Sequence, residues 1–306
     1  MRPTTLVELA TVYGMPVPET RGFGSFSVFS GMYQAACDVL RTEADWRRLV
    51  RETVEDAAAA GAVWVEPAVY LPHHLQRLGP SDDLLALAVD EAERVGAALG
   101  VGVGFMIASD RTLDPADAIE QAHLASRWAD RGVVSFGLAN DEALFGPEPF
   151  EVSFRMARDA GLLLAPHAGE LAGPESIRGA LDVLRADRIQ HGVRAVEDPA
   201  LVERLAASEV CLDVCPTSNV MLSVVPVIGE HPLPALLEAG VRCSVNGDDP
   251  LLFGPGLLEE YDLCRNSLGL DDHAMARIAC CSIESSGAPA DLKARALDDV
   301  ARWLAG

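Results

Sequence analysis

The sequence predicts an α/β fold in which helices cover a parallel sheet. From Glu43 onward, short apolar runs alternate with segments of helical periodicity, the pattern of repeated strand–helix units. Three of the apolar runs end in polar groups that could carry chemistry, and parallel sheets gather such groups at the carboxyl ends of their strands. The chain has 306 residues, of which 49% are hydrophobic, so we expect residues 1–306 to form a single domain with a sizeable core.

The expected elements follow one another in a regular order. A first helix is expected over residues 3–13, where Pro3 and Thr4 suit the first turn and Gly14 ends it. Further helices are expected at 44–60, 81–98, 114–130, 149–160, 174–186, 198–207, 233–239, 255–268, 271–283 and 288–304. Strands are expected at 62–69, 100–108, 132–138, 161–167, 187–191, 209–214 and 241–247. Seven strands are one fewer than a closed barrel of such units contains.

An aromatic segment lies between the first two expected helices. In FGSFSVFSGMY, the side chains of Phe23, Phe26, Phe29 and Tyr33 recur every three to four residues. This spacing is typical of a helix that packs on the sheet wall. The segment also has the length at which an apolar lid over a pocket becomes common, so both interpretations stay open.

Charge and cysteine content exclude several classes of protein. The net charge is −22, which disfavours a nucleic-acid backbone or an anionic membrane as partner and leaves small neutral or cationic substrates open. Seven cysteines without a Cys-x-x-Cys spacing indicate reduced thiols and a cytoplasmic protein, and we expect Cys211, Cys215 and Cys243 to be packing residues. No signal peptide and no apolar run of about 20 residues is present.

Lys293 is the only lysine in the chain. A phosphate-binding loop needs Gly-Lys-Ser/Thr, and a Schiff-base aldolase needs an interior lysine, so neither class fits. Hydrolases that bridge two metals with a modified lysine are disfavoured for the same reason. If the protein is a metalloenzyme of the barrel type, we therefore expect one metal ion per chain.

Three strand ends supply the candidate site. GLLLAPHAGE ends with His167 and Glu170, RIQHG carries His191, and VRCSVNGDDP carries Asp248 and Asp249. His nitrogen and Asp oxygen suit zinc, but two protein ligands are fewer than a catalytic zinc site usually has. Each residue alone is more often a packing or turn residue, and only their conjunction on successive strand ends favours a site.

The remaining side chains have narrower candidate roles. Glu170 could carry protons beside the metal, His191 could hold a hydroxide, and Asp249 could contact substrate. His73 and His74 are expected in a loop. His123, His231 and His273 fall in or beside helices and are assigned no chemistry.

Four stretches, taken in their order and spacing, resemble the adenosine deaminase family. They are HAGE (167–170), RIQHGVRA (188–195), CLDVCPTSNVML (211–222) and VNGDDPLLF (245–253). The resemblance covers nearly the whole chain, and it implies a (β/α)8 barrel of the TIM type with one catalytic Zn²⁺. It also implies that His167 and Asp248 are zinc ligands and that Glu170 protonates purine N1.

Further roles follow from the same resemblance. His191 would position the hydroxide that attacks C6, and Asp249 would hydrogen-bond N7. Gly169 and Asn140 would lie among the substrate-binding residues, with the aromatic segment as a lid over the sugar side. The substrate would be a small-molecule purine nucleoside, and the resemblance says nothing about the oligomeric state.

The sequence departs from the family in two places. The family's first strand, which carries a His-x-His with two further zinc ligands, has no counterpart here, and MRPTTLVELA resembles the segment that follows that strand. We expect that the start is assigned too late and that Met1 is an internal methionine; a natural protein without the strand is the alternative, and it would leave an open sheet edge. Without those ligands the chain should bind zinc weakly and catalyse poorly. In addition, Asn140 replaces a glycine whose N–H meets purine N3.

We therefore predict zinc-dependent hydrolytic deamination at C6 of a 6-aminopurine nucleoside. Adenosine and aminodeoxyfutalosine both fit. Two alternatives stay open, namely an adenine deaminase and a catalytically silent barrel that binds purines. Deaminases of the cytidine type use cysteine ligands in a Cys-x-x-Cys signature, which this chain lacks.

Overall fold

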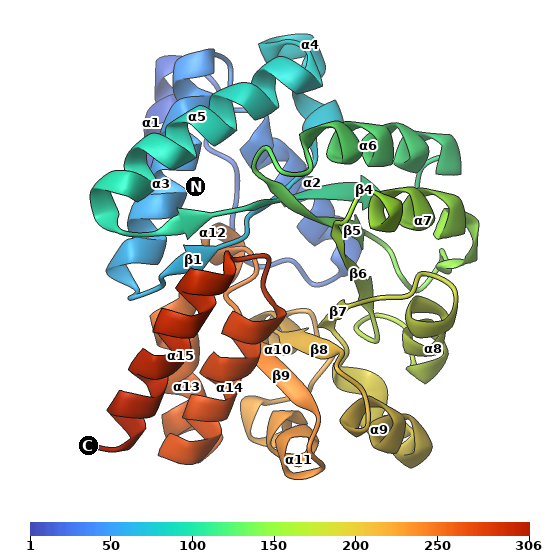
Figure 1. The fold of residues 1–306 in the computed structure, drawn as a ribbon. Helices are drawn as coiled ribbons and strands as arrows, with labels where there is room; N and C mark the ends of the chain where they lie inside the picture. The colour runs from blue at the N-terminus through green and yellow to red at the C-terminus, as the bar shows by residue number, and fades with distance from the viewer.

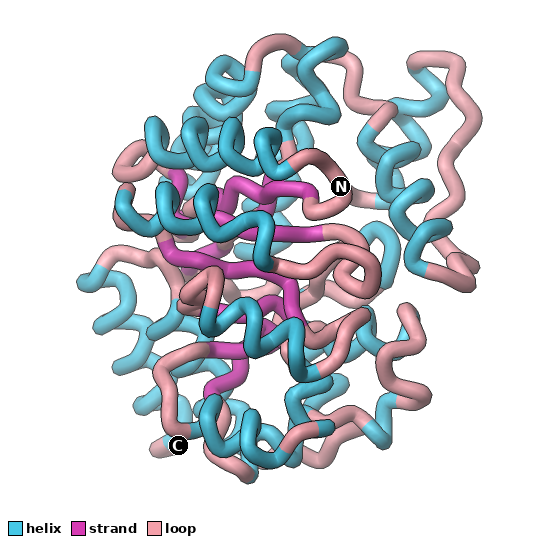
Figure 2. The backbone as a smooth tube through the Cα atoms, turned by 90° about the vertical axis from the view of Figure 1, so that its right-hand side faces the viewer, coloured by secondary structure: helices cyan, strands magenta, loops and turns pink.

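The computed structural model describes residues 1–306, and its centre is a parallel sheet of seven strands with helices outside it (Figures 1 and 2). The strands follow one another in the order β2-β4-β5-β6-β7-β8-β9, and every neighbouring pair is parallel. They are β2 (Ala68–Val69), β4 (Phe105–Asp110), β5 (Val133–Ala139), β6 (Leu163–Ala168), β7 (Arg188–His191), β8 (Cys211–Val214) and β9 (Arg242–Val245). All seven strand regions expected from the sequence are confirmed.

Two of these regions are interrupted. β1 (Trp64–Val65) and β3 (Gly102–Val103) pair with each other in a separate two-stranded ladder, just ahead of β2 and β4. Gly102 and Gly104 allow this arrangement, because a Cβ on either residue would lie within 3 Å of the Trp64 ring. The expected strands 62–69 and 100–108 are therefore each split in two.

The sheet is curled, as one buried ion pair demonstrates. Glu66 lies between β1 and β2, and its carboxylate is 2.7 Å from the Arg188 guanidinium at the start of β7. Because neighbouring strands are about 4.8 Å apart, four strand steps in a flat sheet would separate these residues by about 19 Å, beyond the reach of the two side chains. The sheet therefore bends back on itself in the manner of a TIM-type barrel, with β2 and β9 as its two unpaired edges.

Helices lie outside the curled sheet. Those at positions indicated by the sequence, including the aromatic segment, are α1 (Pro3–Val12), α2 (Phe26–Cys37), α3 (Glu43–Ala59), α5 (Ser81–Leu99), α6 (Pro115–Trp128), α7 (Glu151–Asp159), α8 (Pro174–Asp182), α9 (Pro199–Ala206), α11 (Leu233–Glu238), α13 (Leu257–Asn266), α14 (Asp272–Ser285) and α15 (Ala290–Leu304). The expected helices are thus found, with ends shifted by a few residues. Short helices that the sequence did not indicate are α4 (Leu75–Leu78), α10 (Pro216–Met221) and α12 (Pro250–Phe253), together with 3-10 turns at Leu71–His74, Glu148–Phe150, Val193–Glu197 and Ile228–Glu230.

Side-chain caps explain where several helices begin. Thr42 and Asp45 form a reciprocal capping box at the start of α3, and Asp114, Asp198 and Asp271 accept backbone N–H groups at the starts of α6, α9 and α14. Such caps satisfy N–H groups that have no partner inside the helix. The caps therefore define the first residue of these helices, which the apolar periodicity alone does not determine.

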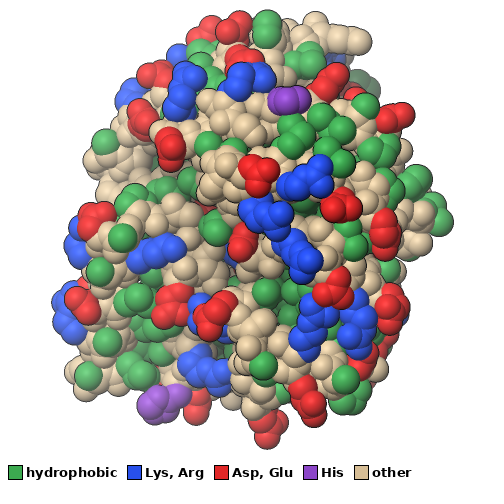
Figure 3. All heavy atoms as spheres, turned by 45° about the vertical axis from the view of Figure 1, so that its right-hand side comes forward, with side chains coloured by type: hydrophobic (Ala, Val, Ile, Leu, Met, Phe, Trp, Pro, Cys, Tyr) green, Lys and Arg blue, Asp and Glu red, His purple; other side chains and the backbone are tan.

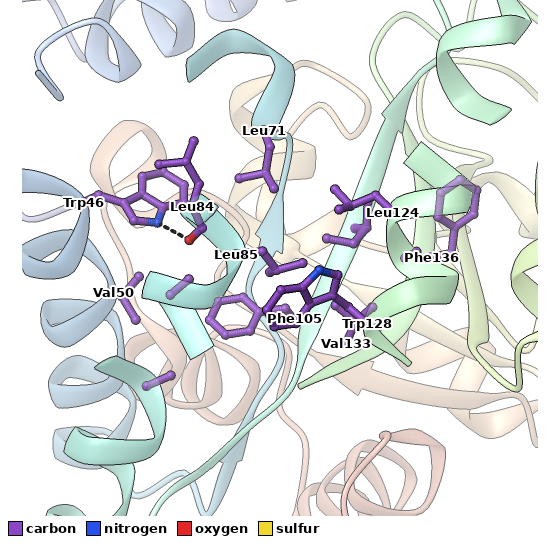
Figure 4. Close-up of a cluster of buried hydrophobic side chains, with 14 of the residues drawn as sticks. Trp46, Val50, Leu71, Leu84, Leu85, Phe105, Leu124, Trp128, Val133 and Phe136 are labelled. Carbon is purple, nitrogen blue, oxygen red and sulfur yellow. Dashed lines mark hydrogen bonds between the residues drawn. The ribbon is translucent and has the colours of Figure 1, made fainter. Parts of the chain in front are cut away.

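The largest apolar core lies between the outer helices and β4–β6. Figure 4 shows part of it, in which Trp46 of α3 lies beside Leu84 of α5, and Leu85 of α5 lies near Phe105 of β4. The Trp46 indole N–H donates a hydrogen bond of 2.9 Å to the carbonyl of Leu84, so its polar atom is satisfied in the core. His74, expected in a loop, instead lies buried beside Trp46.

Two smaller clusters complete the interior. One surrounds β7–β9, with Ile189, Leu212 and Cys243 fully buried. The other joins Phe23 and Phe29 to Leu252 and Phe253. On the molecular face drawn in Figure 3, basic side chains lie among acidic ones and form no broad patch of a single sign.

Candidate active site

The candidate residues predicted from the sequence lie where the strands end. His167 is the last residue but one of β6, Glu170 follows that strand by two residues, and His191 is the last residue of β7. The imidazole rings of His167 and His191 are 5.1 Å apart, and His191 Nδ1 is 3.5 Å from Glu170 Oε1. Potential ligand atoms of His191, Cys215 and Asp248 lie within 4.8 Å of one another. The ends of β7, β8 and β9 thus meet in one group of possible ligands, and His167 and Glu170, at the end of β6, lie beside His191 of that group.

Three residues of the site have backbone φ angles in the left-handed region, which changes the direction of their side chains. His191, Asp248 and Asn140 have φ values of 67°, 54° and 80°, in the left-handed region that residues other than glycine rarely adopt. On a regular strand, Gln190 and His191 would point to opposite faces of the sheet. The positive φ redirects His191 at the strand end, and such strain is typical of functional sites.

His167 presents a free nitrogen. Its Nδ1 is 3.0 Å from the carbonyl oxygen of Leu138, and because a carbonyl only accepts, Nδ1 must carry the proton. Burial holds the pKa of His167 well below its usual range, so the ring is neutral. A neutral imidazole held through Nδ1, with a lone pair on Nε2, is the form in which histidine binds metals.

Glu170 is buried, and its titration is shifted toward neutrality. Burial raises its pKa to about 7, while the nearby His191 lowers it and Asp248 raises it. Its Oε1 atom is buried without a hydrogen-bond partner. A carboxyl group of this kind can both donate and accept a proton near neutral pH.

Asp248 and Asp249 lie after β9, next to the cluster that contains Phe23, Phe29 and Phe253. Asp248 is exposed and Asp249 is half-buried, and burial followed by the charge of Asp248 raises the pKa of Asp249 to about 7. The short helix α12 follows directly, and its Phe253 ring stacks on Phe29 with centroids 5.1 Å apart. The part of the aromatic segment from Phe26 onward forms the helix that the first interpretation expected, but its aromatic side chains pack against Leu252 and Phe253 of α12 and not on the sheet.

The two candidate substrate-binding residues are engaged in other contacts. The Gly169 N–H donates a hydrogen bond of 2.5 Å to Glu142, and its φ of 72° together with a close approach to Ile177 leaves no room for a side chain. The Asn140 amide donates to Asp110 at 2.9 Å, and its oxygen accepts the N–H of Asp141 at 3.0 Å. The side chain of Asn140 is therefore tied to the end of β4.

Sequence reasoning missed several residues that support this site. Glu142 accepts backbone N–H groups from residues 169–172, and Arg111 donates to the carbonyl oxygen of His167 at 2.5 Å. Arg111 follows the last residue of β4, so the same strand-end argument could have identified it. Cys215 is buried, as expected of a packing residue, but its sulfur lies next to Asp248.

The donor set suits a divalent metal such as zinc. Histidine nitrogen and carboxylate oxygen are both zinc ligands, and the free Nε2 of His167 is the form required. Burial raises the thiol pKa of Cys215 well above its usual range, so this sulfur is a protonated packing atom as long as no metal ion binds it. His167, His191, Cys215 and Asp248 are the residues from which a metal site could be built.

Comparisons with known proteins define the family. The family model described as adenosine deaminase matches residues 1–303. The chain belongs to the adenosine deaminase family. It is 43% identical to a Streptomyces coelicolor protein named as an adenosine/adenine deaminase, over 99% of this chain and 93% of that one.

Solved structures show the same fold. The crystal structure of adenine deaminase from Arthrobacter aurescens matches with a TM-score of 0.92 and 32% identity, over 100% of this chain and 95% of that one. An amidohydrolase from Burkholderia ambifaria, solved with bound zinc, matches with a TM-score of 0.85 and 25% identity, over 100% and 89%. The family assignment and the TIM-type fold expected from the sequence are thereby confirmed.

Membership of this family makes the chain an aminohydrolase, an enzyme that hydrolyses a C–N bond. The family is metal-dependent, in agreement with the donor set described above. None of the helices has the length and apolar character of a membrane-spanning segment.

Proposed function

We propose that this enzyme hydrolyses the C6 amino group of a 6-aminopurine nucleoside, such as adenosine or aminodeoxyfutalosine, and releases ammonia. The observation that carries the proposal is the position of Glu170, whose pKa is raised to about 7 and which lies 3.5 Å from His191 at the carboxyl ends of β6 and β7. A buried carboxyl that titrates near neutrality suits proton transfer to a ring nitrogen.

Each candidate residue has a role in this reaction. Protonated Glu170 donates its proton to purine N1, which makes C6 more electrophilic. The water that adds to C6 returns one proton to the Glu170 carboxylate, and its second proton goes to the amino group, which leaves as ammonia while C6 becomes a carbonyl. Asp249, with its pKa raised to about 7, donates a hydrogen bond to N7 in its protonated form. His191 hydrogen-bonds the incoming oxygen. Gly169 and Asn140 stay as proposed parts of the wall that contacts the substrate.

Zinc, one ion per chain, would be held by the Nε2 of His167 and a carboxylate oxygen of Asp248. When bound, it supplies Lewis acidity that brings the pKa of a water molecule near 7. The aromatic cluster at Phe23, Phe29 and Phe253 lies beside Asp249 and would keep bulk water from the reacting edge of the purine.

Free adenine is the second candidate substrate. One observation favours it, namely that the Arthrobacter aurescens protein matched at a TM-score of 0.92 is an adenine deaminase. Adenine carries no sugar on N9. The pocket of a nucleoside deaminase must therefore hold a ribose next to N9, whereas that of an adenine deaminase need not. A barrel that binds purines without turnover is the third case, and the experiment below distinguishes it.

The test measures ammonia release from adenine, adenosine and aminodeoxyfutalosine by the zinc-loaded protein. Release from one or both nucleosides in preference to adenine supports the proposal, and release from adenine alone replaces it with the second candidate. Glu170→Gln is the matched variant, because it keeps the shape of the side chain and removes its proton. Calorimetric binding of a purine without ammonia release from any of the three would contradict an enzymatic role.

A further inference from the structure

A chain of three hydrogen bonds reaches His191 from outside the strand layer. The N–H of Leu233, at the start of α11, lies 3.1 Å from His231 Nδ1. His231 Nε2 is 3.2 Å from Asn219 Oδ1, and Asn219 Nδ2 is 3.2 Å from His191 Nδ1. His231, Asn219 and His191 are 4%, 0% and 2% exposed, so water does not compete for these bonds.

The hydrogen bond from the Leu233 N–H determines which atom donates in each of the other two hydrogen bonds. A backbone N–H can only donate, so Nδ1 of His231 accepts and its ring proton is on Nε2. That proton is donated to an acceptor, which places the oxygen of the Asn219 amide toward His231. The nitrogen of the amide then faces His191 and donates to Nδ1. The orientation of an asparagine amide is normally assigned from its network, and here the network allows one orientation.

From this chain we infer that Asn219 and His231 are positioning residues that fix the ring proton of His191 on Nε2. Glu170 Oε1 is the other group near Nδ1, but at 3.5 Å it is too distant to form a good hydrogen bond and set the tautomer. His191 therefore presents an N–H to the pocket and not a lone pair.

This tautomer is the opposite of the one that His167 adopts. Leu138 fixes the proton of His167 on Nδ1 and leaves a lone pair on Nε2. Of two rings only 5.1 Å apart, one can thus bind a metal through Nε2 and the other can donate a hydrogen bond from Nε2. The hydrogen bonds from Asn219 thus make His191 a hydrogen-bond donor, whereas His167 remains a possible metal ligand. This holds although His191 itself lies within ligand distance of Cys215 and Asp248.

The catalytic consequence rests on the proposed function. An N–H on Nε2 stabilises negative charge as it develops on the attacking oxygen, whereas a lone pair there would repel that charge. Groups that orient a catalytic histidine in this way change activity by about 10- to 100-fold when they are altered. Asn219 and His231 are expected to act on the rate of turnover more than on substrate binding.

The decisive variant is Asn219→Asp, which keeps the shape and replaces the amide nitrogen by an acceptor oxygen. Its carboxylate still accepts from His231, but the second oxygen requires a proton on Nδ1 of His191, so the tautomer reverses. The readout is the pair of ring ¹⁵N signals of His191 in zinc-loaded protein labelled with ¹⁵N-histidine. We expect wild type to show the proton on Nε2 and Asn219→Asp to show it on Nδ1, with kcat lowered about 10- to 100-fold and KM little changed.

A second pair of variants keeps the test decisive if Asn219→Asp does not fold. His231→Gln retains a donor for Asn219 and should preserve the wild-type signals, whereas His231→Phe removes the donor and should yield a mixture of tautomers. His273→Gln, in the exposed part of α14, is the matched control.

Three results would overturn the inference: a wild-type signal with the proton on Nδ1, a zinc-bound Nε2 of His191, or variants that leave the tautomer unchanged. The NMR result does not depend on turnover, so a failure of the proposed function would be seen separately in the ammonia assay.

Discussion

Glu142 holds the backbone of Glu170 in place, because its Oε2 atom accepts the N–H of Glu170 at 2.9 Å. The same carboxylate also accepts the N–H groups of Gly169, Leu171 and Ala172, at 2.5, 2.8 and 3.2 Å. Four successive donors thus converge on one buried side chain from the loop after β5. The peptide that carries the proposed acid is fixed by a residue that need not touch the substrate.

We expect Glu142→Gln to lower both stability and activity. Gln loses the charge and offers only one acceptor oxygen, so buried N–H groups are left without partners at a cost of about 1–3 kcal/mol. Urea unfolding measures the loss, and steady-state kinetics should show a fall in kcat. Glu148→Gln, on the same loop but exposed, is the control and should leave both unchanged. Equal effects of the two substitutions would contradict the role given to Glu142.

Glu170→Gln tests the proposed acid directly. General acid–base catalysis contributes about 10²- to 10⁴-fold, so kcat/KM should fall within this range while purine binding and the circular dichroism spectrum persist. Glu175→Gln, with its side chain 91% exposed at the start of α8, should behave as wild type. Ammonia release by Glu170→Gln at the wild-type rate would remove Glu170 from the mechanism.

Metal content distinguishes two sets of ligands. If zinc binds to His167 and Asp248, then His167→Gln and Asp248→Asn should lower the zinc bound per chain, and Cys215→Ser should not. If the metal is instead held by the group of His191, Cys215 and Asp248, Cys215→Ser should lower it as well. Elemental analysis after dialysis gives the ratio of zinc to protein. A chelator should also lower the melting temperature of wild type, because a metal that binds only the folded chain stabilises it.

Stability should fall between pH 6.5 and pH 4 because of His74. Burial, with a smaller effect from Arg77, lowers the pKa of His74 to about 4, so the unfolded chain takes up a proton in this range before the folded chain does. The stabilising contribution is present above pH 6.5 and decreases as the pH falls, by up to about 3 kcal/mol in total. His74→Gln cannot titrate and should flatten this part of the profile in urea unfolding. A profile identical to wild type would show that the pKa of His74 is the same in the folded and unfolded chain.

Strand ends explain how much of the site could be predicted. The sequence places His167, Glu170, His191 and Asp248 directly after apolar runs, and parallel pairing then brings such residues to one end of the sheet. The helices and strands were predicted because apolar periodicity covers most of the chain. These inferences need only local sequence and one rule about parallel sheets.

The missed residues act through contacts that no local pattern encodes. Glu142 reaches backbone groups about 28 positions away, and Asn219 reaches His191 across 28 positions. His231, to which the sequence analysis assigned no chemistry, is buried against Asn219. Backbone donors and ring tautomers have no signature in a single sequence, so the support of the site became visible only when distant loops were placed together.

The Glu66–Arg188 pair should be the costliest ion pair to break. Both side chains are about nine-tenths buried, and Glu66 Oε1 also accepts the N–H of Gly287 at 2.5 Å. Arg188 additionally contacts Asp213 at 3.4 Å, so loss of Glu66 leaves part of the buried charge uncompensated.

Glu66→Gln should therefore lower the free energy of unfolding by several kcal/mol, close to the 3–5 kcal/mol typical of a broken buried pair. The double variant with Arg188→Met should be more stable than the sum of the two single changes predicts, because neither charge is then left alone. The exposed pair Arg295–Asp291 serves as control, and Arg295→Gln should cost less than about 1 kcal/mol. Additive effects in the double variant would mean that the curled sheet does not depend on the contact between these two residues.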